Sequence, residues 1–237
     1  PRPRTGLGLL RDAPGARAAS TTTLRGRMRA VARSSDPLVI SKANTPATVH
    51  RATYLDYVAV KEFDAAGAPC AEHRFVGLWT STAYFASPHD IPLLRRKVDA
   101  VIAHFGLEPA SHDGKAVMAV LENWPRDELF QSSEAQLVAF ARSVVNLYER
   151  RTTRLLLRRD PFDRFWSCMV YVPRDRYTTE VRHRVERILR DALHGVALES
   201  QVQISGSNHA RLHVVVRTSP EAAPRPDVGG LEARIAL

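Results

Sequence analysis

The chain has 237 residues, of which 44% are hydrophobic and 25% charged, a composition typical of globular protein with a sizeable core. Its formal net charge is +9, but residues 1–35 supply +7 of this, because they hold eight arginines and one acid. The bulk charge is therefore weak evidence for a polyanion-binding protein. No apolar run approaches the ~18 residues of a membrane-spanning helix, which excludes a spanning segment.

The first residues give little sign of targeting. The chain begins with Pro1, and its opening lacks the apolar centre of a secretion signal, so we expect a fragment whose true start is missing. Cys70 and Cys168 are too few for a disulfide framework. We therefore expect a cytoplasmic protein with reduced cysteines.

Residues 1–35 have two interpretations. The stretch "STTTLRGRMRAVAR" could start a helix capped by Ser20 or a neighbouring threonine. The segment could equally be a disordered basic arm.

An antiparallel sheet is predicted in residues 36–88. "PLVISKAN" is a short apolar strand, "TYLDYVAVKEF" alternates with a period near two, and "EHRFVGLWTSTAYF" does so less regularly. Between them "DAAGAP" contains Gly67 and Pro69 and predicts a hairpin turn. At least three strands are expected over residues 37–86.

A helical connector is predicted in residues 89–151. In "SPHDIPLLRRKVDAVIAHFG" the apolar residues share one face, Gly106 ends the helix, and "RRK" lies on the solvent face. A second helix, "KAVMAVLENW", stops before Pro125. A third begins with capping-box spacing at Ser133 and Gln136. Its inward stripe is Leu137, Phe140, Ala141, Val144, Val145 and Tyr148.

Residues 152–218 predict two strands, a helix and two more strands. The first pair, residues 153–160 and 164–173, flanks the turn "DPFD". The helix spans 178–195, with Thr178 or Thr179 as cap and Gly195 in the left-handed position beyond its end. "SQVQI" and "ARLHVVVRT" form a hairpin around "SGSN". Residues 219–237 are a tail in which a truncated helix begins.

The order ββαββα is a cyclic permutation of the βαββαβ order of ferredoxin-like domains, which small ACT-type domains share. One sheet face should then carry helices and the other should be open to a partner domain or a ligand. The predicted class is α+β, with small antiparallel-sheet modules joined by a helical segment.

Cysteines and histidines offer no clear site. Cys168 lies in mid-strand on one face with Trp166, Val170 and Val172, which favours a packed core thiol over a nucleophile. Cys70 is expected to be exposed in a turn. His209 and His213 flank a strand, where four residues span roughly 13 Å, too far to share a metal ion.

Two other motifs favour structural roles. Gly114 and Lys115 start a helix, but Ala116 stands where a phosphate-binding loop needs Ser or Thr. Asp127 and Glu128 are adjacent and so point about 100° apart on a helix. We expect Asp127 to be a helix N-cap and Glu128 a first-turn charge.

A nucleic-acid platform needs aromatic and basic residues on one open face. Trp166 and Tyr171 fall on opposite faces because their separation is odd, and Phe162 lies in the turn. The candidate residues for such a platform are Phe162, Phe165, Trp166 and Tyr171 with Arg158, Arg159 and Arg164.

Four stretches resemble the N-terminal regulatory part of the large bacterial NAD-specific glutamate dehydrogenases. They are "LVISKANTPATVHRATYLDYVAVKEFDAAG", "RFVGLWTSTAYFASPHDIPLLRRKV", "SHDGKAVMAVLENWPRDELFQ" and "RRDPFDRFWSCMVYVPRDRYTTEVRHRVE". The resemblance covers residues 36–217 in order. It implies a PAS-like module for the first sheet and an ACT-type module for residues 152–218.

The resemblance also implies a function. The parent enzyme would convert L-glutamate, NAD and water to 2-oxoglutarate, ammonium and NADH, while this segment would be non-catalytic and would serve regulation and assembly of a homo-oligomer. No catalytic, cofactor-binding or metal-binding residue is carried over, and NAD belongs to the parent enzyme. The expected partners are the downstream catalytic domain, other subunits and an amino-acid effector. The alternative is a free-standing basic module that contacts nucleic acid through residues 1–35.

Overall fold

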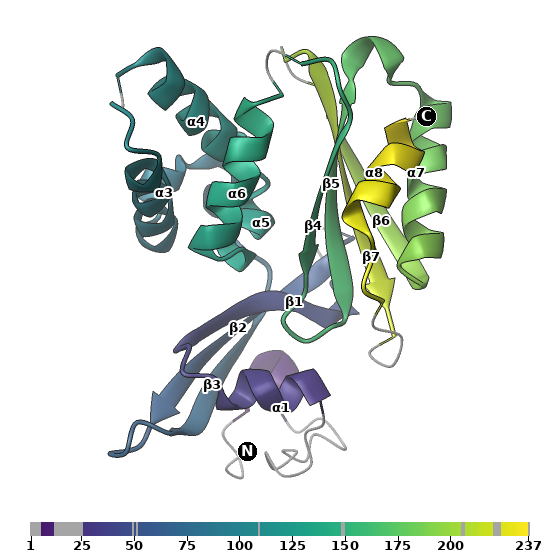
Figure 1. Cartoon of the computed structure of the whole chain (residues 1–237). Coiled ribbons are helices and arrows are strands. Elements are labelled where there is room, and N and C mark those ends of the chain that lie inside the picture. Colours follow the sequence, from purple (N-terminus) through teal and green to yellow (C-terminus); the bar gives the residue numbers. More distant parts are fainter. Residues whose placement is uncertain are drawn as a thin grey trace. The chain divides into compact units, whose positions relative to one another are not determined.

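The chain forms two compact units, Pro1–Ser81 and Thr82–Leu237. Helices and two separate antiparallel sheets confirm the predicted α+β class (Figure 1). In the part of the chain that the structure describes, no helix is both long and apolar enough to cross a membrane. The computed structural model describes residues 6–11, 26–48, 50, 52–108, 110–147, 150–204, 207–219 and 224–236.

The first unit is built on a three-stranded antiparallel sheet with β2 at its centre. The predicted turn forms at Gly67, whose φ of 76° suits glycine. Asp64 Oδ1 accepts hydrogen bonds from the backbone N–H groups of Ala66 and Ala68, each at 2.9 Å, which stabilises this turn. The elements are η1 Gly8–Leu10, α1 Gly26–Arg33, β1 Leu38–Pro46, β2 Tyr54–Phe63 and β3 Pro69–Gly77.

Within residues 1–35, Gly26–Arg33 forms helix α1, whereas the suggested cap Ser20 lies outside the described residues. Lys61 of β2 holds the end of this helix. Its ammonium donates to the carbonyl oxygens of Val31 and Ser34 at 2.5 and 2.9 Å. A cation at a helix C-terminus satisfies carbonyls that have no partner within the helix.

The prediction of sheet up to residue 86 is wrong at its end. Strand β3 ends at Gly77, and Ser81–Phe85 forms the short helix α2. The apolar residues of so short a run fit either period, so the pattern alone could not decide between strand and helix.

Four longer helices follow in the second unit. Gly106 ends the first of them in the left-handed conformation, with φ 61°, as predicted. The capping box of Ser133 and Gln136 is also confirmed. Helix α5 is the helix whose first turn was predicted to hold Glu128. The elements are η2 Pro88–Asp90, α3 Pro92–Phe105, α4 His112–Glu122, α5 Arg126–Gln131 and α6 Glu134–Val145.

The rest of the second unit is a four-stranded antiparallel sheet in the order β4-β5-β7-β6. A ferredoxin-like sheet has the order 4-1-3-2, and starting that chain at its second strand gives the order seen here. The predicted permutation is therefore confirmed. The elements are β4 Arg154–Arg159, β5 Phe165–Pro173, η3 Arg174–Arg176, α7 Thr179–Ala192, β6 Gly195–Ile204, β7 His209–Thr218 and α8 Val228–Ala236.

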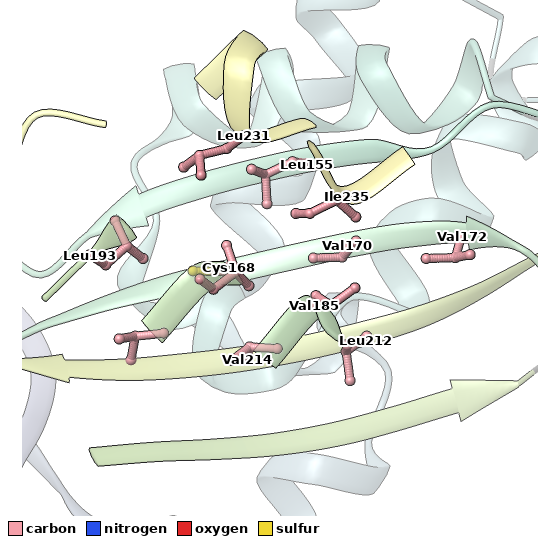
Figure 2. Close-up of a cluster of buried hydrophobic side chains, with 12 residues drawn as sticks. Leu155, Cys168, Val170, Val172, Val185, Leu193, Leu212, Val214, Leu231 and Ile235 are labelled. Carbon is pink, nitrogen blue, oxygen red and sulfur yellow. The ribbon is translucent and has the colours of Figure 1, made fainter. Parts of the chain in front are cut away.

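The main core lies between this sheet and helices α7 and α8 (Figure 2). Alternate residues of β5 and β7 point into it, because successive side chains of a strand point to opposite faces. The core comprises Leu155, Cys168, Val170, Val172, Val185, Leu189, Leu193, Leu212, Val214, Val216, Leu231 and Ile235.

The C-terminal residues contribute to this core. Residues 219–237 were predicted to be a tail with the start of a helix, and α8 is that helix. Leu231 and Ile235 are only 4% and 5% exposed, so α8 is an integral layer of the sheet module.

The prediction for Gly195 is wrong by one residue. His194 takes the left-handed conformation, with φ 54°, and Gly195 begins β6. Gly195 is needed for a different reason, because a Cβ there would lie 2.5 Å from Cγ1 of Val216.

The second face of the sheet is covered by the chain's own helices. Figure 1 shows α5 and α6 on the side of the sheet opposite to α7 and α8. All of β5 except Trp166 is buried, as expected for a strand that is covered on both faces. The sequence predicts that this face is open to a partner domain, and the helical connector is what covers it.

Candidate functional site

A buried ion cluster joins helix α5 to the second face of the sheet. Arg158 of β4 donates from Nε and Nη2 to the two carboxylate oxygens of Glu128, both at 2.7 Å. Nη2 also donates to Oε1 of Gln131 at 3.0 Å. The Arg158 and Glu128 side chains are 2% and 4% exposed. This two-point geometry fixes the orientation of the helix on the sheet as well as its distance.

The two charges stabilise each other's ionised state. Burial alone would raise the pKa of Glu128, but the charge and hydrogen bonds of Arg158 outweigh burial and hold that pKa below its ordinary value. Burial would likewise lower the pKa of Arg158, which Glu128 instead raises. Either group left alone would be a buried charge without compensation.

His213 of β7 and Ser167 of β5 extend the cluster across the sheet. Ser167 Oγ and His213 Nε2 are 2.9 Å apart, and His213 Nε2 lies 3.8 Å from Glu128 Oε1. Burial lowers the pKa of His213 despite the attraction of Glu128. The neutral imidazole is therefore the form that suits the folded protein.

This burial predicts a loss of stability in mild acid. The unfolded chain binds a proton at His213 more tightly than the folded chain, so protonation favours unfolding as the pH falls below the ordinary histidine pKa of about 6.5. The loss contributed by one proton is at most about 1.4 kcal/mol per pH unit. Urea denaturation between neutral pH and mild acid should show a smaller decline for His213→Gln than for the wild type.

His112 supplies the control, because it is exposed at the start of α4. His112→Gln should follow the wild-type decline. An identical decline for His213→Gln would contradict a neutral buried imidazole.

Lys97 of α3 binds the C-terminal end of α5, the helix that carries Glu128. Its ammonium donates to the carbonyl oxygens of Leu129, Phe130 and Ser132 at 3.0, 2.7 and 2.7 Å, around the end of α5. Burial lowers the pKa of Lys97 to about 8. The prediction that "RRK" faces solvent holds for Arg95 and Arg96, which are exposed, but is wrong for Lys97.

The predicted roles of the two adjacent acids need correction. Pro125 occupies the N-cap position of α5, so Asp127 is not a cap. Asp127 instead accepts a hydrogen bond from the hydroxyl of Tyr84 at 2.9 Å. Glu128 lies in the first turn as predicted but is buried against the sheet.

The cysteines and the other histidine singled out in the sequence lie in different surroundings. Cys168 is fully buried, as predicted, and burial raises the pKa of its thiol. Cys70 is exposed, although at the start of β3 rather than in a turn. His209 Nε2 donates to the carbonyl oxygen of Thr152, 3.1 Å away. Among the described residues, no group of three or more His, Cys, Asp and Glu side chains could hold a metal ion.

The contacts of Gly114 at the start of α4 are those of a capped helix N-terminus. Ser111 is the N-cap of α4 and accepts from the backbone N–H of Gly114 at 3.0 Å. Gly114 is buried and Lys115 exposed.

The arginine and aromatic residues around the "RRDPFDRF" turn do not form a platform. Phe165 and Tyr171 are buried, and Arg158 is held by Glu128. Arg159 lies over the ring of Trp166 at 5.5 Å from its centroid, and an equivalent contact joins Arg164 to Phe162 at 4.5 Å. The rings of Trp166 and Phe162 are therefore in contact with arginines of the same chain.

In a comparison with known proteins, the residues of the cluster fall in two regions that match different family models. Residues 91–150 match the family model described as glutamate dehydrogenase, helical motif 1. Residues 154–237 match the model described as glutamate dehydrogenase, ACT2 domain. Glu128 lies in the first region and Arg158 in the second, so the ion pair links them.

Three similar proteins are NAD-specific glutamate dehydrogenases. The enzyme of Pseudomonas aeruginosa is 39% identical over 208 residues, covering 87% of this chain and 13% of the relative. Those of Halomonas elongata and Mycobacterium tuberculosis are each 37% identical, over 195 and 218 residues, covering 82% and 89% of this chain. The chain spans only 12% and 13% of those two relatives.

Proposed function

Because the chain belongs to the family of the NAD-specific glutamate dehydrogenases, we propose that it is a non-catalytic regulatory and assembly segment of such an enzyme. The whole enzyme would oxidise L-glutamate with NAD and water to 2-oxoglutarate, ammonium and NADH. In this proposal the catalytic and NAD-binding residues lie in the rest of the enzyme, since the chain spans about an eighth of its relatives.

The observation that carries the proposal is the buried ion pair between the helical region and the ACT-type sheet. Because Arg158 and Glu128 meet at two points, a change in the position of the sheet must either move α5 or separate two buried charges. Helix α5 and the sheet that it contacts can therefore have discrete alternative arrangements. A ligand or subunit that prefers one of them would shift the enzyme by a coupling of ~1 to 3 kcal/mol.

The proposal extends to the parts of the chain around this pair. The sheet in residues 36–88 is a PAS-like module, residues 89–151 connect the modules, and the ACT-type module of residues 152–218 continues through α8. The partners are the catalytic domain and other subunits of the same homo-oligomer, with an amino-acid effector, in the cytoplasm.

The Pseudomonas aeruginosa enzyme allows a direct test. We would compare the intact enzyme, a form lacking the segment that matches this chain, and a chimera in which this chain replaces that segment. Glutamate-dependent NADH formation, effector response and oligomer size would be measured for each. We expect the deletion to change at least one of these properties and the chimera to restore it.

Two outcomes would count against the proposal. A deletion that leaves turnover, effector response and oligomer size unchanged would refute a regulatory or assembly role. NADH formation by the isolated 237-residue chain with L-glutamate and NAD would refute its non-catalytic character.

A further inference from the structure

A small pocket lies between the helices and the sheet, next to the ion cluster but separate from it. Its volume is about 70 Å³. Helices α4 and α6 supply an apolar wall made of Ala119, Val120 and Val144, and Leu147, just beyond the end of α6, extends it. The sheet side is polar, with Tyr171, His209 and Arg211 from β5 and β7. The pocket therefore offers an apolar wall opposite hydrogen-bonding groups, which is the usual composition of a small-ligand site.

Arg211 gives this pocket its charge. Its guanidinium is half-buried and donates to the carbonyl oxygen of Asn123 and to the side-chain oxygen of Gln203. Among the described residues, no carboxylate forms an ion pair with Arg211. Burial lowers the pKa of Arg211, and only the Tyr171 hydroxyl opposes that effect.

The contrast with Arg158 is informative. Both arginines project from the same face of the sheet towards the helices, yet only Arg158 has a carboxylate partner in this part of the chain. A half-buried guanidinium that has neutral partners gains from an added anion, and its planar donors match a carboxylate at two points.

We propose that this pocket binds a small aliphatic carboxylate, with Arg211 holding the carboxylate and the α4–α6 wall contacting the aliphatic part. The volume corresponds to roughly five to seven water-sized positions, which suits a carboxylate with a short carbon chain. Such a ligand would contact the helices and the sheet together. It would therefore favour the arrangement in which the two are docked, which deepens the regulatory role proposed above.

The test uses the full 237-residue chain and isobutyrate as the probe, with isobutyramide as its uncharged counterpart. Calorimetric titration should give saturable binding of isobutyrate with a Kd near or below about 1 mM, and no saturable binding of isobutyramide.

Two variants locate the site. Arg211→Gln should weaken isobutyrate binding at least about tenfold, and Ala119→Leu should abolish it by filling the pocket. Arg187→Gln, at an exposed arginine of α7, should bind as the wild type does. Circular dichroism would confirm that each variant is folded.

The proposal is overturned by failure of the wild type to bind isobutyrate, by equal binding of isobutyramide, or by wild-type affinity in folded Arg211→Gln. These measurements concern binding by this chain alone. The chimera tests turnover and assembly, so the two proposals can fail separately.

Discussion

Replacing Arg158 by methionine is expected to lower the free energy of unfolding of this chain by about 3 to 5 kcal/mol. The change removes the charge that compensates Glu128, which is 4% exposed and would remain buried. It also leaves Gln131 without its donor. Urea or guanidinium denaturation followed by circular dichroism would measure the loss.

Two further variants show whether the cost comes from the uncompensated charge. The double variant Glu128→Met with Arg158→Met should recover most of the loss, because it removes both charges and keeps apolar volume. Arg151→Met supplies the control. Arg151 is 81% exposed and lies 3.8 Å from Asp175, so its loss should change stability by no more than about 0.5 kcal/mol. A double variant that is no more stable than Arg158→Met would contradict this account.

Replacing Leu231 by alanine is expected to cost about 2 to 5 kcal/mol, because the side chain is 4% exposed in the core between α8 and the sheet. Glu232, the next residue of α8, also attaches the helix to β4. Its carboxylate accepts from the backbone N–H of Leu155 at 2.8 Å and from Arg154 at 3.1 Å. Helix α8 therefore closes the edge of the sheet at β4.

Val228→Ala provides the matched comparison, since Val228 begins the same helix and is 41% exposed. Its effect should be small. If Leu231→Ala leaves the denaturation midpoint unchanged, α8 is an appendage and not a layer of the module.

The predictions that succeeded rest on short-range chemistry. Ser133 and Gln136 form the capping box, and Gly106 takes the left-handed position, because each residue interacts with backbone only a few positions away. Cys168 was placed in the core because strand alternation assigns it to the same face as its apolar neighbours.

The errors have equally definite causes. The run before Phe85 is too short for its period to distinguish a strand from a helix. Lys97 was assigned to solvent from helix periodicity, but its partners are carbonyl oxygens more than thirty residues away. No local pattern shows that such carbonyls are near.

The candidate sites were missed for the same reason. Glu128 and Arg158 are 30 residues apart, and Ser167 and His213 are 46 apart. One signal was available. In "TRLLLRRD" Arg158 shares a strand face with Leu156, which hints that its face is covered.

The sequence by itself determined the class of the fold, the permuted order of the sheet module and most helix limits. These follow from periodicity, caps and turns, whose energies depend on neighbouring residues. Only the tertiary structure decided that the connector covers the second sheet face, that α8 completes the first, and that Arg158 has a carboxylate partner where Arg211 has neutral ones. Burial and charge pairing depend on which distant segments meet, and this is decided by packing.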